Sequence, residues 1–152
     1  MKILSFIFAL MISSSVLSGE TLARNTLALG DETSINEAIL ALYESELENP
    51  TSPLSLEIAR INADEVQDSG ELTTPNERDI WLISSGRGSY TSFGHTYLLG
   101  VPVFWNGSGM IEEYIEYIVV NVSIDFSTDD ETGDYAESIV TIVFEKIISI
   151  QL

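Results

Sequence analysis

The side chains best suited to chemistry gather in the middle third of the chain, around its single histidine. His95 lies in the segment Phe93-Gly94-His95-Thr96-Tyr97, and histidine is the side chain most often used as a general base near neutral pH. A hydrolase-like site would need a nucleophile such as Ser92 and an orienting acid such as Asp79, held together in space. No G-x-S-x-G motif accompanies them. No residue is therefore assigned a catalytic role, and the sequence favours a protein that is not an enzyme.

Aromatic residues and one arginine surround this histidine, and they could contact a ligand or a partner. The candidates are Trp81, Arg87, His95, Tyr97 and Trp105. Arg87 stands between two glycines in the segment 84–89, whose composition resembles an anion-binding loop, although no Walker lysine follows it. The aromatic rings would line a ligand groove or form a protein-binding face, or else pack into the core.

An acidic segment at 129–134 is the one place where a cation could bind. It combines Asp129, Asp130, Glu131 and Asp134 with a glycine, and calcium prefers several oxygen ligands on a flexible loop. The spacing does not match an EF-hand, so we predict no metal site and no cofactor. The segment is either a loose cation site or a solvated hairpin tip whose charges discourage aggregation.

Composition limits the partners. The chain has 152 residues, 45% of them hydrophobic, which is enough for one domain with a sizeable core. It carries 24 acidic and 6 basic side chains, a net charge of −18. Such a charge disfavours nucleic acid and anionic lipid, while a basic protein would be attracted. The chain has no cysteine, which excludes disulfides, thiol catalysis and thiolate metal sites.

The N-terminus has the pattern of a signal peptide over residues 1–18. Lys2 precedes a short apolar run from Ile3 to Ile12, and small residues follow. Cleavage is expected before Gly19, with a second possibility after Ala23. The rival interpretations are an uncleaved anchor and a buried helix. We expect an exported protein, periplasmic or secreted, without stable membrane insertion after cleavage. Residues 19–32 would form a flexible lead-in, and 33–152 a single domain.

A helix is predicted directly after the lead-in. Ser34 and Glu37 form the S-x-x-E pattern of a capping box, in which each side chain bonds a backbone N–H at the helix start. Apolar residues recur at helical spacing through 35–42. Pro50 ends the helix, because the residue before a proline avoids the α conformation.

The remainder of the chain predicts strands. Short ones are expected over 54–59, 80–83 and 97–105, separated by loops over 63–77 and 84–89. Pro102 cannot donate a hydrogen bond to a neighbouring strand, so the third strand should lie at an edge or carry a bulge. From Ile118 to Phe126, and again from Val140 to Leu152, apolar residues occupy alternate positions. This pattern predicts a long antiparallel hairpin at the end of the chain.

Together these elements predict one α+β domain, with an N-terminal amphipathic helix packed on a curved antiparallel sheet of about five strands that ends in a long β-hairpin. The layout resembles that of cystatin-like domains and of the nuclear-transport-factor-2-like domains. No family motif accompanies it, so the resemblance implies an architecture and no activity.

We therefore expect an exported acidic binding or interaction module. It would present the segments 63–77 and 84–95 to a protein or a small-molecule ligand, a basic protein being one candidate. The alternative is a small ligand-pocket protein or enzyme of a cone-shaped α+β fold that uses His95 with a nearby carboxylate.

Overall fold

The computed structural model of the chain describes residues 21–28, 34–64, 66, 70–89, 92–106, 110–128, 131–132 and 135–150. In chain order its elements are β1 (Ala23–Ala28), α1 (Ile35–Leu47), α2 (Pro53–Asp64), β2 (Gly70–Leu72), the 3₁₀ helix η2 (Glu77–Asp79), β3 (Ile80–Ser89), β4 (Ser92–Asn106), β5 (Met110–Thr128) and β6 (Tyr135–Ile148). The predicted signal peptide lies outside the described residues, as does most of the acidic segment at 129–134.

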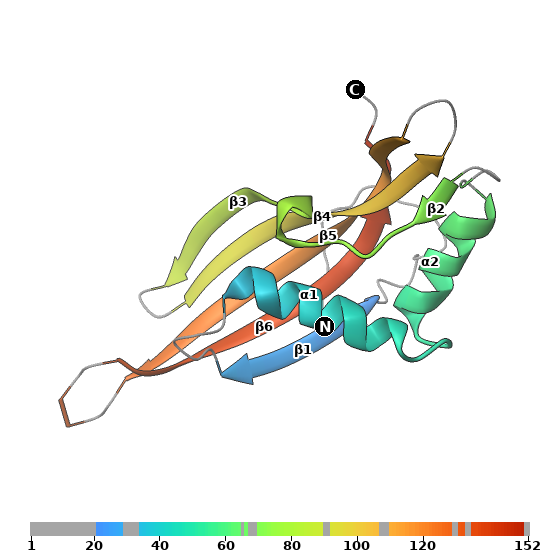
Figure 1. Ribbon diagram of the computed structural model, residues 1–152. Helices are drawn as coiled ribbons and strands as arrows, with labels where there is room; N and C mark the ends of the chain where they lie inside the picture. Colours follow the sequence, from blue (N-terminus) through green and yellow to red (C-terminus); the bar gives the residue numbers. More distant parts are fainter. Residues whose placement is uncertain are drawn as a thin grey trace.

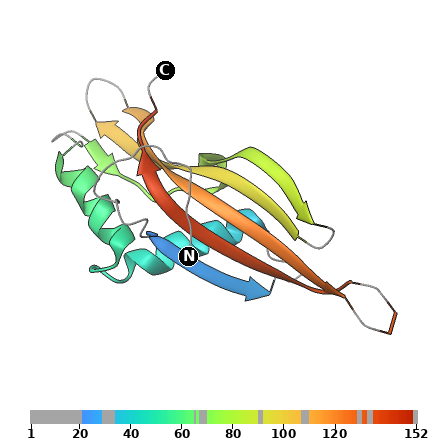
Figure 2. The same ribbon diagram turned by 180° about the vertical axis from the view of Figure 1, so that it is seen from behind.

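Six strands form one antiparallel sheet, which is strongly curved. Its order is β1-β6-β5-β4-β2, and β3 pairs with β4 on the same side as β2. Both helices lie on one side of the sheet, which we call the inner face (Figure 1, Figure 2). The prediction of an α+β fold with a curved antiparallel sheet is confirmed. The described residues form two α-helices where the sequence predicted one. Neither of these described helices has the length and apolar character needed to cross a bilayer.

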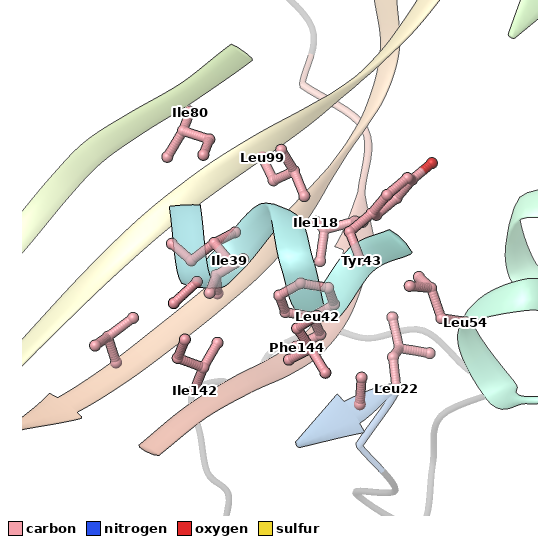
Figure 3. Packing of buried hydrophobic residues seen from close by; sticks show 14 of the residues in the cluster. Leu22, Ile39, Leu42, Tyr43, Leu54, Ile80, Leu99, Ile118, Ile142 and Phe144 are labelled. Carbon is pink, nitrogen blue, oxygen red and sulfur yellow. The ribbon is translucent and has the colours of Figure 1, made fainter. Parts of the chain in front are cut away.

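The core lies between the inner face and the helices. Alternate residues of each long strand point toward the helices, and they are buried in β5 and β6: Ile118, Val120, Val122, Ile124, Val140, Ile142 and Phe144. These are the alternate positions that the sequence predicted for 118–124 and 140–144. Figure 3 shows Ile39, Leu42 and Tyr43 of α1 packed over this surface. Burial of each such large side chain contributes about 1.5–3 kcal/mol.

The start of α1 is fixed by hydrogen bonds between its first residues. The backbone N–H of Glu37 donates to Oγ of Ser34 at 3.1 Å, and the N–H of Ser34 donates to Oε1 of Glu37 at 3.3 Å. These bonds satisfy two donors that the helix itself cannot pair.

Burial raises the pKa of Tyr43, on the core side of α1, to about 12.

The segment 54–59 is helical, so its prediction as a strand is wrong. Pro53 occupies the first position of α2, where its missing N–H is harmless, and the N–H of Ser55 donates to Oγ of Ser52 at 3.1 Å. Leu54 and Ile61 are buried and Ile58 is half-buried, which is helical spacing. Leu56, between them, is 57% exposed. Residues 54 and 58 fit both an alternating and a helical pattern, which explains the error.

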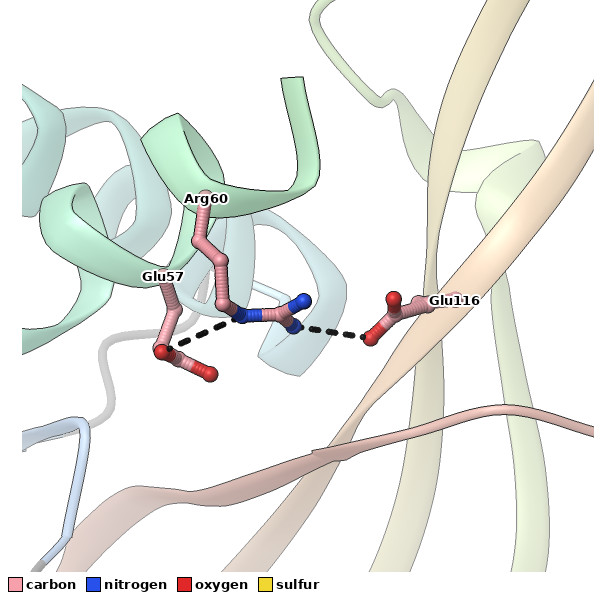
Figure 4. Close-up of polar contacts among 3 residues, drawn as sticks. All are labelled: Glu57, Arg60 and Glu116. Carbon is pink, nitrogen blue, oxygen red and sulfur yellow. Dashed lines mark hydrogen bonds and ion pairs between the residues drawn. The ribbon is translucent and has the colours of Figure 1, made fainter. Parts of the chain in front are cut away.

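An ion pair fastens α2 to the sheet (Figure 4). Nη2 of Arg60 lies 3.3 Å from Oε1 of Glu116, a buried carboxylate on the inner face of β5. Nε of Arg60 lies 3.5 Å from Oε2 of Glu57, one turn earlier on α2. Because Glu116 is taken out of water, its charge needs this cation.

Three further predictions of irregular structure are wrong for the residues described. Ala23–Ala28, in the expected lead-in, form β1 and pair with β6. The expected loop at 84–89 is the second half of β3, paired with β4. The expected loop at 63–77 is wrong only in part, because it contains the end of α2, all of β2 and the start of η2, while residues 73–76 are irregular as predicted. In each case pairing across the sheet or packing supplies the order that the polar and glycine-rich sequence did not indicate.

A register shift does occur at Pro102, but its extra residue, Ile115, lies on β5 and not on the strand predicted to carry the bulge. The register of β4 with β5 shifts between Val101 and Pro102. The alternative, an edge strand, does not apply, because β4 has paired neighbours on both sides.

The Arg60–Glu116 contact makes a testable prediction. Arg60→Leu is expected to lower the free energy of unfolding by about 1–3 kcal/mol, because it leaves a buried carboxylate without a partner. Glu57→Gln removes only the more exposed acid and is expected to change it by less than about 0.5 kcal/mol. Urea denaturation measures both. The double variant Arg60→Leu/Glu116→Leu should recover most of the loss; a double variant as unstable as Arg60→Leu alone would contradict this account.

Candidate ligand-binding surface

Three of the five candidate residues lie on the inner face at one end of the sheet. Ile80 of β3 and Leu99 of β4 form a buried cross-strand pair on this face. Counting by twos along β4 from Leu99 places Tyr97 and His95 on the same face. The partner of residue 93 is Arg87, which therefore also lies on this side.

These residues form what we call the inner-face patch, defined by Leu82, Arg87, Phe93, His95, Tyr97 and Phe126. The guanidinium carbon of Arg87 lies 4.8 Å from the centre of the Phe93 ring, a cation–π geometry. Phe93 meets Phe126 edge to face at 5.6 Å, and the rings of His95 and Tyr97 are 6.2 Å apart. These contacts join β3, β4 and β5 through side chains as well as through the backbone.

One end of the paired strands β3 and β4 extends past the start of α1 (Figure 1, Figure 2). Leu82 is 56% exposed. Phe93, Tyr97 and Phe126 are only partly buried, with one side packed against the core. An apolar surface anchored on one side and open on the other can accept another molecule without rearrangement of the core.

The patch contains polar groups as well as rings. Burial raises the pKa of Tyr97, so its hydroxyl stays protonated near neutral pH and can donate a hydrogen bond. Nδ1 of His95 is buried and has no hydrogen-bond partner among the residues that the structure describes. The Tyr97 hydroxyl and the guanidinium of Arg87 suit a flat apolar ligand that carries an acceptor or an anionic group, whereas Nδ1 of His95 is too buried to contact it.

The hypothesis of a Ser92, His95 and Asp79 triad is not supported. Ser92 is three positions from His95 on β4, so the alternation of side chains puts the two on opposite faces. The carboxylate of Asp79 accepts a hydrogen bond from the backbone N–H of Asn76 at 2.7 Å and another from the Tyr114 hydroxyl. Asp79 is thus buried and occupied away from the histidine.

Trp81, the fourth candidate, lies on the outer face and belongs to an aromatic cluster. Its ring is 5.1 Å from that of Tyr114 and 5.9 Å from that of Tyr117, and those two rings are 5.7 Å apart. Gly100 lies beneath them, because a Cβ there would be only 2.5 Å from Cδ1 of Tyr114. The cluster and the Tyr114–Asp79 hydrogen bond tie β3 and η2 to β5. Sequence analysis missed Gly100, Tyr114 and Tyr117, since only strand register brings them together.

Trp105, the fifth candidate, packs at the opposite end of β4. Its ring fills the space above Gly70 of β2, where a Cβ would lie 2.6 Å from Cζ3 of the indole. Its Nε1 donates to Oε1 of Glu113 at 2.7 Å. Both contacts hold the short strand β2 against β4, so Trp105 is a packing residue.

Among the described residues, no three acidic or histidine side chains gather in a way that could hold a metal ion. Comparison with protein-family models, with curated proteins and with solved structures found no match to this chain. Inferences about its function therefore rest on its own residues.

The aromatic cluster makes the second testable prediction. Gly100→Ala is expected to lower the free energy of unfolding by about 1–3 kcal/mol, because the added methyl group overlaps Tyr114. Gly94→Ala is the matched control, since it lies on the same strand with nothing within 4 Å of the new Cβ. Thermal unfolding of both variants tests the prediction. Equal losses of stability would show that the cluster does not constrain Gly100.

Proposed function

We propose that this chain is a non-enzymatic binding domain that is exported and acts in the periplasm or outside the cell. Its ligand is an apolar or aromatic molecule, or such a side chain of a protein, with an anionic or acceptor group attached. The support comes from the inner-face patch, the one described region where exposed apolar surface, a guanidinium and half-buried rings occur on the same face.

The charge of the protein sharpens this proposal. A net charge of −18 repels free anions, so an anionic aromatic compound would bind only where a local cation and apolar surface outweigh that repulsion. Arg87 provides the cation, and Phe93 and Tyr97 provide the rings. Specificity would follow from the combination of the Arg87 cation with the aromatic rings, since in an acidic protein neither the cation nor the rings alone would suffice to bind an anionic ligand.

A basic protein is a second candidate partner, favoured by a different surface. Glu37, Glu44 and Glu48 are exposed on α1, on the same side of the sheet as the patch (Figure 1). Their negative potential would steer a cationic partner toward this side before short-range contacts form.

The anionic dye anilinonaphthalene sulfonate is a direct probe of the patch, because its fluorescence rises on apolar surfaces. We expect it to bind the folded protein, and Arg87→Gln to weaken binding severalfold. Arg24→Gln is the matched control, since it removes an exposed arginine from β1 and changes the net charge equally. Fluorescence titration of the three proteins measures the effect.

Equal weakening by Arg24→Gln would show that the dye responds to net charge and not to the patch.

The alternative function, an enzyme that uses His95, has its own signature. Hydrolysis of a chromogenic ester that His95→Ala abolishes, with dye binding intact, would favour the enzyme over the binding domain.

The proposed export predicts a processed N-terminus. Loss of residues 1–18 removes Lys2 and no acidic residue, so the net charge changes from −18 to −19. Mass spectrometry of the protein from fractionated bacterial cells should find a chain that begins at Gly19 outside the cytoplasm. Leu10→Arg, which interrupts the apolar run, should leave the intact chain inside. An unprocessed wild-type chain, Met1 included, in the soluble cytoplasmic fraction would contradict export.

A further inference from the structure

The outer edge of β3 is open. Along one side β3 pairs with β4, and no described strand pairs with its other side. Trp81 through Ser89 are all exposed. The register of β3 with β4 shifts between Leu82 and Ser84 and again between Arg87 and Ser89. Between these two shifts the outer edge offers backbone donors and acceptors that another strand can satisfy.

The same edge carries apolar side chains. Trp81, Leu82 and Ile83 are consecutive, with exposed fractions of 38%, 56% and 54%. The other large apolar residues that are exposed in the described part of the chain are Leu47 at the end of α1, Leu56 on α2 and Ile150 after β6. Because successive strand residues point to opposite faces, Leu82 belongs to the inner face and Trp81 to the outer aromatic cluster. Ile83, at the register shift, is the exposed apolar side chain of the edge itself.

Charge identifies what the edge can accept. The ten residues of β3 include no acidic side chain and one cation, Arg87, in a chain with 24 acidic side chains. A basic partner would be drawn to the acidic surfaces and not to this strand. Two copies of the chain, by contrast, can approach here without carboxylates facing each other. The edge of β1 is also free of acids, but its exposed side chains are those of Arg24, Asn25, Thr26 and Ala28, which offer little apolar area.

We infer that two copies of this chain associate through antiparallel pairing of their β3 strands around a two-fold axis. Such an interface is self-complementary, because each copy contributes the same strand in opposite directions. With the axis near Ile83, Arg87 of each copy lies toward η2 of the other, where Glu77 is exposed. The pairing satisfies the backbone of both edges and buries Ile83. This inference does not rest on the proposed binding function.

Sedimentation velocity of the full chain across a wide concentration range tests the inference. We expect a monomer–dimer equilibrium that Ile83→Lys weakens at least about tenfold, since a charged side chain on an edge strand opposes pairing. Leu56→Lys is the matched control: it adds the same charge at a position on α2 that is 57% exposed, and it should leave the equilibrium unchanged. Leu82→Lys is a second disrupting variant, and far-UV circular dichroism shows that each variant is folded. Ile83 lies outside the inner-face patch.

Salt and charge reversal complete the test. Association of two anionic chains should strengthen with added salt, which screens their mutual repulsion, whereas binding of a basic partner would weaken. Arg87→Glu and Glu77→Arg should each weaken the dimer, and the two together should restore it. A monomer at every concentration and salt level would overturn the inference. A dimer that Leu56→Lys disrupts and Ile83→Lys does not would overturn it as well.

Discussion

The longest strand of the sheet, β5, extends about three times as far in space as α1, the helix that packs on it, and the rest of the structure depends on this mismatch in length. At 3.3 Å per residue β5 extends over about 63 Å, while α1 at 1.5 Å per residue covers about 20 Å. The apolar inner face is therefore longer than the helix that buries it. α2 covers one end, fastened by the Arg60–Glu116 ion pair. The opposite end, with Phe93, His95 and Tyr97, stays partly open, so the candidate site follows from the way the core is closed.

Local pattern predicted the parts of the fold in which one face of an element is buried. Alternation at 118–124 and 140–144 gave the inner positions of β5 and β6, because burial on one side alone leaves a period of two in the sequence. The same rule failed at 54–59, where residues 54 and 58 fit a helix equally well. The Ser52-Pro53 start signal favours the helix. The alternation rule failed again at 84–89, because β3 is exposed on both faces there and its sequence has no apolar pattern to detect.

The candidate site was predictable only within one strand. His95 and Tyr97 share a face because they are two residues apart on β4. Arg87 joins them through the register of β3 with β4, and Phe126 through β5, which no local pattern specifies. Trp81 and Trp105 show that closeness to the histidine in sequence does not place a residue in the patch. Both are aromatic residues near the histidine in sequence, yet Tyr114, Gly100 and Gly70 hold them in packing contacts away from the patch. Residue type suggested the candidates, and strand register decides which of them share the inner face.

Arg87 connects the inner-face patch with the outer edge of β3. Its backbone belongs to the open edge of β3, and its side chain lies over Phe93 on the inner face. A two-fold axis perpendicular to the sheet keeps both inner faces on the same side. In the proposed pair the two sheets therefore continue into one curved surface, and the two inner-face patches lie on either side of the axis. A ligand with two aromatic groups would then gain effective concentration from binding both patches, although each patch alone offers only a shallow contact.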